Sequence, residues 1–203
     1  LINDSLTNSY NKKNQITFLS KNEIGYKNLL YLSSLSHINS NLDFPYLKTE
    51  DIFKYKEGLI VFFGGIYNPC LNLFNKNKIN DLKDLITIFK KEFNENLFFE
   101  LQRINNPEID NFEENFINFS LDYNIPLIAT NNVQYPTKDY YESHDSLICI
   151  SEKSRIDHEN RKKSNPNFYF KSSDEMYELF TDIPEALENT FLLSIKCNHS
   201  PTS

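Results

Sequence analysis

Leu127-Ile128-Ala129-Thr130-Asn131-Asn132-Val133-Gln134-Tyr135 is an apolar strand that runs directly into a polar turn. In α/β proteins, ligands and catalytic groups gather at the C-terminal ends of the strands, so the turn is where such groups would lie. A metal-binding Asp-x-His would fit its spacing. Asn132 and Gln134 occupy those positions instead, and amides bind metal ions weakly.

Three other apolar runs, together with residues 126–129, alternate with stretches of helical periodicity along the chain. They cover residues 15–19, 59–63 and 97–101. Such alternation is typical of parallel βα units. We therefore predict an α/β fold with a parallel sheet.

Two central helices are predicted from apolar residues that recur every three or four positions. Residues 108–123 carry one stripe and residues 81–93 another. The stripe positions are Phe112, Phe116, Phe119 and Tyr123 in the first helix, and Leu85, Ile88 and Phe89 in the second.

Two further helices are predicted near the C-terminus. Ser172 and Glu175 have the spacing of a capping box, which starts a helix running to about Phe180. Pro184 suits the first turn of a helix Pro184–Lys196. Its apolar stripe is predicted at Leu187, Phe191 and Ile195.

Length and charge narrow the class of protein. The 203 residues, 39% of them apolar, are enough for one domain with a real core. The net charge of -7 argues against a surface that itself carries nucleic acid. One basic cluster lies in the long polar segment 151–167, which we interpret as a mobile, solvated loop, although contact with a phosphate backbone in a larger assembly stays open. The cluster comprises Lys153, Arg155, Arg161, Lys162 and Lys163.

The three cysteines indicate a cytoplasmic protein. Cys70, Cys149 and Cys197 form no CxxC pair and are odd in number, which favours neither a disulfide framework nor a zinc knuckle. No apolar run approaches the ~18 residues of a membrane span. Because the only methionine is Met176 and the chain opens at Leu1 in a polar run, we expect a fragment of a longer protein.

Two groups at strand ends have more than one interpretation. Glu100, followed by Gln102-Arg103, places a carboxylate and a guanidinium at the mouth of the sheet, either as a structural ion pair or hydrogen-bond anchor or for ligand binding. Gly64-Gly65 allows a tight turn or a phosphate-binding turn. The tight turn is favoured because no GxGxxG or GxxxxGK[ST] surrounds the pair.

The histidines do not form a metal motif. His144-Asp145 is predicted in a helix, where adjacent side chains diverge by about 100° and cannot chelate one ion together. His37, His158 and His199 are expected in polar loops without ligand spacing. No GxSxG elbow is present, and Cys149 lies in an apolar stretch, so no nucleophile is predicted.

Five segments, in order, resemble the PHP (polymerase and histidinol phosphatase) domain of bacterial replicative DNA polymerase III alpha subunits. The resemblance runs from about Gln15 to Asn198 and is most specific at residues 182–190. The segments are residues 25–29, residues 57–65 with Glu57-Gly58-Leu59-Ile60 and Gly64-Gly65, residues 99–103 (FELQR), residues 126–133 and residues 176–197. The resemblance implies that residues 1–203 are one partial PHP domain, a distorted βα barrel whose N-terminal strands are missing.

The resemblance also implies where metal ligands would lie. The first ligand motifs would precede Leu1. Metal-binding relatives would carry His at the position of Ile104 and Asp-x-His at those of Asn132 and Gln134. Loss of even a residue that only hydrogen-bonds to a metal ligand typically costs ~10–100-fold in metal affinity, so three neutral replacements predict no metal centre. No catalytic, cofactor-binding or metal-binding residue is therefore assigned.

The function implied by the resemblance is that of a non-catalytic scaffold in a DNA-directed DNA polymerase. Nucleotide transfer would reside in a magnesium-dependent palm beyond Ser203. The partners implied are the remainder of the alpha subunit, the proofreading exonuclease and, through the full-length protein, primer-template DNA. The alternatives are a metal-dependent PHP phosphoesterase or 3′-5′ exonuclease, and a stand-alone interaction module.

Overall fold

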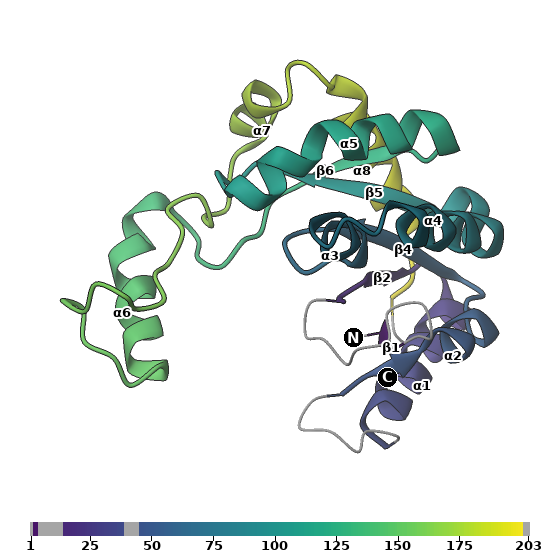
Figure 1. Ribbon diagram of the computed structural model, residues 1–203, viewed down its shortest axis with the longest axis horizontal. Helices are drawn as coiled ribbons and strands as arrows, with labels where there is room; N and C mark the ends of the chain where they lie inside the picture. The colour runs from purple at the N-terminus through teal and green to yellow at the C-terminus, as the bar shows by residue number, and fades with distance from the viewer. Residues whose placement is uncertain (1, 4–13, 39–44, 201–203) are drawn as a thin grey trace.

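A mixed four-stranded sheet forms the centre of the computed structural model, which describes residues 2–3, 14–38 and 45–200 (Figure 1). The strand order is β2-β4-β5-β6. A second, two-residue parallel pairing joins β1 (Ile2–Asn3) to β3 (Leu47–Lys48). The four main strands are β2 (Thr17–Ser20), β4 (Leu59–Gly64), β5 (Leu97–Gln102) and β6 (Leu127–Thr130). The predicted α/β class is confirmed.

The direction of the first strand differs from the sequence-based prediction. β4, β5 and β6 are parallel, as expected, but β2 pairs antiparallel with β4, with Thr17 opposite Phe62 and Ser20 opposite Leu59. Alternating strand and helix patterns do not encode the direction of an edge strand, because an open sheet accepts an antiparallel strand at its edge. The prediction of parallel units was therefore wrong for β2 alone.

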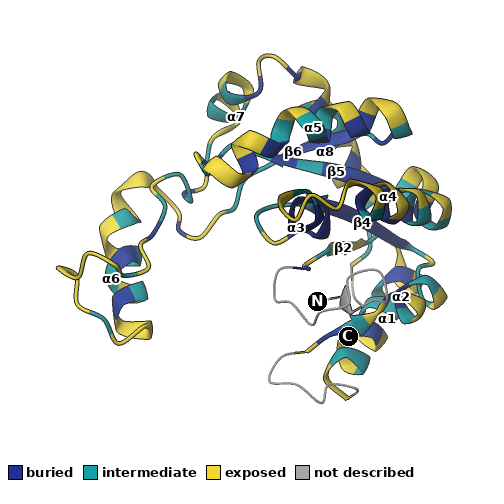
Figure 2. Cartoon of the chain, viewed as in Figure 1, coloured by how far each residue is buried: buried dark blue, intermediate teal, exposed yellow. Residues whose placement is uncertain are grey.

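The two faces of the sheet pack against different helices. Leu59, Val61 and Phe63 belong to the main core with α3, α4 and α5, whereas Ile60 and Phe62 turn to the opposite face. Side chains alternate across a strand, so one run of apolar residues supplies both cores. Figure 2 shows the central strands as buried and the outer helix faces as exposed. Full burial of each large apolar side chain contributes about 1.5–3 kcal/mol.

Eight helices lie in the described residues, with short 3₁₀ turns at Asn94–Asn96 and Lys138–Tyr140. The helices are α1 (Glu23–Ile38), α2 (Thr49–Lys54), α3 (Pro69–Asn75), α4 (Ile79–Phe93), α5 (Pro107–Tyr123), α6 (Tyr141–Ser151), α7 (Ser173–Leu179) and α8 (Pro184–Lys196). None is long and apolar enough to cross a membrane. His37, expected in a loop, lies in the last turn of α1, so that expectation was wrong.

Asparagine residues cap both ends of the helix α5. The Asn106 side chain accepts a hydrogen bond from the backbone N–H of Glu108 at 3.0 Å, and Asn124 ends the helix in the left-handed conformation. The predicted stripe is buried at Phe112, Phe116 and Phe119. Tyr123 at its end is half-buried. This stripe holds α5 against β5.

The capping box of α7 is confirmed. Ser172 Oγ accepts from the backbone N–H of Glu175 at 3.2 Å, and Glu175 Oε2 accepts from the backbone N–H of Ser172 at 2.9 Å. Each partner satisfies an amide that the first helical turn would leave unpaired. The helix therefore begins at the residue that the sequence predicts.

The orientation of α8 differs from the prediction, although its bounds agree. Its buried residues are Ala186 and Leu193, whereas Phe191 and Ile195 of the predicted stripe are 65% and 57% exposed. Hydrogen bonds to β6 explain this orientation. Asn189 donates to the carbonyl oxygen of Leu127 at 2.9 Å, and the Thr190 hydroxyl accepts from the backbone N–H of Ala129 at 3.0 Å. These bonds cover the free edge of β6 and turn the larger apolar side chains outward.

The segment of residues 136–168, which we call the α6 arm, lies away from the sheet (Figure 1). Its two ends meet in a bridge between Tyr135 and Tyr169. The Asn165 side chain donates to the carbonyl oxygen of Ile104 at 2.8 Å, and Tyr135 Oη donates to the carbonyl oxygen of Asn165 at 2.7 Å. The arm is thereby anchored beside the ends of the parallel strands.

Candidate functional site

The C-terminal ends of β4, β5 and β6 lie side by side and form the candidate site. Gly64 pairs with Glu100, and Gln102 pairs with Thr130. A Cβ atom on Gly64 would lie 2.3 Å from the Cβ of Glu100, and Gly65 has φ +70°. Gly64-Gly65 is therefore a tight turn that brings the two strand ends together, as the sequence favours.

Glu100 is held within the sheet end. Its carboxylate accepts a hydrogen bond from the hydroxyl of Thr130 at 2.6 Å. Burial raises the pKa of this carboxyl, and the hydrogen bonds from Thr130 and Gln102 offset part of that rise. Glu100 thus acts as a hydrogen-bond anchor, one of the two predicted possibilities.

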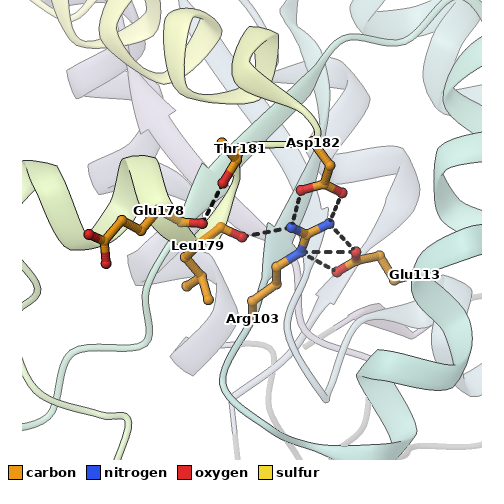
Figure 3. A network of polar contacts seen from close by, with 6 residues as sticks. All are labelled: Arg103, Glu113, Glu178, Leu179, Thr181 and Asp182. Atoms are coloured by element: carbon orange, nitrogen blue, oxygen red, sulfur yellow. Dashed lines mark hydrogen bonds and ion pairs between the residues drawn. The ribbon is translucent and has the colours of Figure 1, made fainter.

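Arg103 forms its ion pairs with α5 and with the turn between α7 and α8 (Figure 3). Its guanidinium contacts Glu113 of α5 at 2.6 Å and Asp182 of the α7–α8 turn at 2.5 Å. It also donates to the carbonyl oxygen of Leu179 at 2.7 Å and lies over the Phe180 ring. These hydrogen bonds raise the pKa of Arg103 and lower the pKa of Asp182. Arg103 therefore forms structural ion pairs, but with Glu113 and Asp182 and not with the carboxylate of Glu100. They join the end of β5 and the helix α5 to the α7–α8 turn.

Ile104 lies in the main hydrophobic core and is 2% exposed. Its side chain has no atom that can ligate a metal. Its backbone carbonyl accepts the hydrogen bond from Asn165 that anchors the α6 arm. The position serves packing and anchoring.

Asn132 and Gln134 pair with each other in the turn after β6. Gln134 Nε2 donates to Asn132 Oδ1 at 2.7 Å, and both residues line a hollow of 590 Å³. Across residues 2–3, 14–38 and 45–200, no three His, Cys, Asp or Glu side chains come together as a metal site would require. The oxygen-bearing side chains at the ends of β5 and β6, one carboxylate held by Thr130 and two amides paired with each other, do not fit a metal centre.

The α6 arm contains a buried ion pair that sequence analysis missed. Arg161 and Asp145 have side chains only 8% and 11% exposed, joined by Nη1 to Oδ1 at 2.9 Å and by a second contact from Nη2 to Oδ2. Arg161 and the backbone N–H of Ser164 lower the pKa of Asp145 to about 2. The interpretation of a solvated loop was wrong for Arg161. No local signal marks the pairing, since sixteen residues separate the partners.

His144 sits in α6, as predicted. Its Nδ1 lies 2.7 Å from Ser164 Oγ, and its ring packs against Tyr135 at 5.3 Å between centroids. His199 packs against Tyr26, and His158 is exposed in the arm. The four histidines therefore lie in four separate environments of the described chain, and His144 has the contacts of a structural residue.

The cysteines are not placed for nucleophilic chemistry. Cys70 and Cys149 are buried, and Cys197 is half-buried. Burial raises the pKa of the Cys70 and Cys197 thiols, which disfavours the reactive thiolate.

Comparison with known proteins gives matches along most of the chain. The PHP domain family matches residues 3–104. DNA polymerase III subunit alpha of Borreliella burgdorferi is 38% identical over 184 residues, which is 90% of this chain. The same subunit is 33% identical in Caulobacter vibrioides and 38% identical in Rickettsia bellii, again over 90% of the chain.

The chain spans only 16% of the length of these three relatives. The family match ends at Ile104, while the similarity to the polymerase subunits covers 90% of the chain and so continues beyond it through the α6 arm. From its α/β fold and these matches, the chain belongs to the PHP domain family and is similar to the PHP region of DNA polymerase III alpha subunits.

Proposed function

We propose that residues 1–203 form one partial PHP domain that acts as a non-catalytic scaffold in the alpha subunit of a replicative DNA polymerase. The observation that carries the proposal is the donor set at the strand ends. Ile104 is buried in the core, and the amides of Asn132 and Gln134 are paired with each other. The remaining carboxylate, that of Glu100, is held by Thr130.

The energetics of metal binding support this proposal. Loss of one residue that only hydrogen-bonds to a metal ligand typically costs ~10–100-fold in metal affinity. Here three positions that would supply ligands carry an alkyl group and two amides. We therefore expect the affinity of this site for zinc or manganese to be too low to keep a metal ion bound.

Exposed apolar side chains on α8 support a packing role. Phe191, Leu192 and Ile195 lie on the outer side of α8, each more than half exposed. We call them the α8 outer face. Contiguous exposed apolar surface commonly marks a contact with another protein part. We assign this face to the remainder of the polymerase alpha subunit.

The activity of the whole protein belongs to the same proposal. Nucleotide transfer to primer-template DNA would take place in a part of the polymerase outside these residues, with magnesium as its cofactor, in the cytoplasm. The PHP domain would support that core and dock the proofreading exonuclease. The similarity to polymerase alpha subunits over 90% of the chain supports this assignment.

Metal analysis of the full-length gene product tests the scaffold role. We expect less than stoichiometric zinc or manganese after purification, and no phosphatase or 3′-5′ exonuclease activity that depends on this domain. The alternative, a metal-dependent phosphoesterase, would be established by two observations together. The purified protein would contain stoichiometric metal and a phosphoesterase activity, and substitution of Glu100 would remove both.

Substitution on α8 tests the packing role. Phe191→Ser with Ile195→Ser in the full-length protein should loosen the domain, seen as faster proteolytic release of the PHP region with polymerase activity reduced. Leu121→Ser, at a residue 75% exposed on α5, is the matched control and should leave both unchanged. Equal behaviour of the two variants would contradict the assigned contact.

A further inference from the structure

Polar contacts at its base, rather than apolar packing, set the direction of the α6 arm. Among the residues that the structure describes, neither hydrophobic core includes a residue of α6. The outgoing and returning segments of the arm meet at Tyr135 and Tyr169. The backbone N–H of Gln134 donates to the carbonyl oxygen of Phe168 at 2.7 Å, which joins the two segments to each other. Such a narrow connection can act as a hinge, because a few residues at the ends of elements absorb the change in backbone angles.

Asparagine side chains attach the base of the arm to the ends of β5 and β6. Asn165 and Asn167 both donate to the carbonyl oxygen of Ile104, at 2.8 and 3.4 Å. Asn131 donates to the carbonyl oxygen of Tyr169 at 2.6 Å. Since Ile104 is 2% exposed and belongs to the main core, this attachment is a fixed point of the arm.

The carboxylate of Glu175, in the first turn of α7, makes a second attachment. Lys138 Nζ, on the outgoing segment, lies 3.0 Å from Glu175 Oε1. Tyr169 Oη, at the end of the returning segment, donates to the same oxygen at 2.8 Å. The other oxygen accepts the capping-box hydrogen bond from Ser172. One carboxylate therefore joins both segments of the arm to α7, and we call Lys138, Tyr169 and Glu175 the Glu175 cluster.

The Glu175 cluster combines a buried ring with an exposed ion pair. Tyr169 is 8% exposed, and the ammonium groups of Lys138 and Lys171 lie over its ring, at 4.9 and 4.4 Å from the centroid. The backbone N–H of Ser172, together with Lys138 and Tyr169, lowers the pKa of Glu175 to about 2, so this carboxylate is charged at neutral pH. The Lys138 side chain is 68% exposed. Its pairing with Glu175 is therefore open to screening by salt.

We propose that the Glu175 cluster is a releasable latch that fixes the angle between the α6 arm and the sheet. When the pair of Lys138 with Glu175 opens, the arm turns about its two connecting segments while the bonds to Ile104 hold its base. The turn moves two exposed apolar side chains of α6, Leu147 and Ile150, relative to the sheet. This device goes beyond the scaffold role and is independent of it, because it concerns the angle of one arm and not metal content or catalysis.

The angle of the arm is measured on the 203-residue chain as a distance between two spin labels. The labels are attached at Leu147→Cys in α6 and Leu121→Cys in α5, both exposed positions. Cys197 is replaced by serine, and the native thiols of Cys70 and Cys149 are buried. Double electron–electron resonance should give one narrow maximum for the unsubstituted cluster at low salt. Raising the salt from about 0.05 M to about 0.5 M should add a second, displaced maximum, because the screening length shortens about threefold.

Lys138→Met opens the latch without touching the capping box of α7. We expect it to lose the single narrow maximum already at low salt, with the helix content by circular dichroism unchanged. Lys27→Met is the matched control, since it breaks an exposed ion pair of α1, that with Glu23 at 2.6 Å. Ser172→Ala is a second control, which weakens the start of α7 but keeps Glu175. Both controls should keep the single maximum at low salt.

Four results would overturn the proposal. The first is a single narrow maximum for Lys138→Met at both salt concentrations, and the second is the same loss of the maximum in Lys27→Met. The third is a broad distribution for the unsubstituted cluster at low salt, which would mean that the pair does not hold the arm. The fourth is a fall in helix content in Lys138→Met, which would show that the arm unfolds instead of turning.

Discussion

Arg103 holds β5, α5 and the α7–α8 turn together, and its replacement by methionine removes the cation while keeping an unbranched apolar stem. The side chains of Arg103 and Glu113 are 20% and 17% exposed. Removing one partner of a fully buried pair costs about 3–5 kcal/mol, because the other charge is left unpaired. Since water reaches part of this network and Asp182 is mostly exposed, we expect Arg103→Met to lower the free energy of unfolding by about 2–3 kcal/mol.

Thermal unfolding followed by circular dichroism gives the readout. For a chain of this length, each kcal/mol lowers Tm by roughly 2–4 °C, so Arg103→Met should lower it by about 4–12 °C. Adding Glu113→Gln should recover part of the loss, because the unpaired charge is then removed. Lys78→Met, which breaks the exposed ion pair with Asp81 at 3.2 Å, is the control and should cost about 0–1 kcal/mol.

Two results would refute this reasoning. One is an Arg103→Met variant whose Tm falls no further than that of Lys78→Met. The other is a double variant, with Glu113→Gln added, that is less stable than Arg103→Met alone. Either would mean that the network in Figure 3 is not a buried charge cluster in solution.

Three further predictions concern pH, the glycine turn and a helix cap. The pKa of Asp145 is about 2 in the folded chain, below the unfolded value of about 3.9. Its stabilisation is therefore complete above the unfolded pKa and is lost as the pH falls towards 2. Urea unfolding at a series of pH values should show that the difference in free energy of unfolding between the unsubstituted chain and Asp145→Asn shrinks as the pH falls towards 2. A difference that stays constant with pH would argue against the pairing. Gly65→Ala should lower the free energy of unfolding by about 1–2 kcal/mol, because residue 65 has a positive φ that alanine adopts only with strain. Gly64→Ala should lower Tm further, since its Cβ would meet Glu100 at 2.3 Å, and the reverse order would contradict the turn geometry. Ser172→Ala should lower the free energy of unfolding by about 0.5–2 kcal/mol, because it removes the N-cap of α7. Ser173→Ala, at the residue after the cap, is the control and should lower it by less in the same measurement.

Much of the local structure was predictable from the sequence. The bounds of α8, the capping box of α7 and the buried stripe of α5 follow from residues close together in the chain. Helix periodicity and capping chemistry act over one or two turns, so a short window contains the information needed. The four central strands were likewise found within one or two residues of their observed bounds.

The candidate site was predictable only in part. The sequence located the turn with Asn132 and Gln134 at a strand end and correctly favoured a tight turn at Gly64-Gly65. It did not predict which residues meet there. Arg103 pairs with Asp182, seventy-nine positions away, and Asn165 reaches Ile104 across sixty-one positions.

By itself, the sequence determined the α/β class, the ends of the principal helices and strands, and the chemical character of the strand ends. The tertiary structure alone decided the antiparallel direction of β2, the buried side of α8, the pairing of Asp145 with Arg161 and the hollow beside Lys162 and Lys163. Local patterns reflect how neighbouring residues share one helix or strand. Contacts between distant segments depend instead on which packing buries the most apolar surface while leaving few polar groups unpaired.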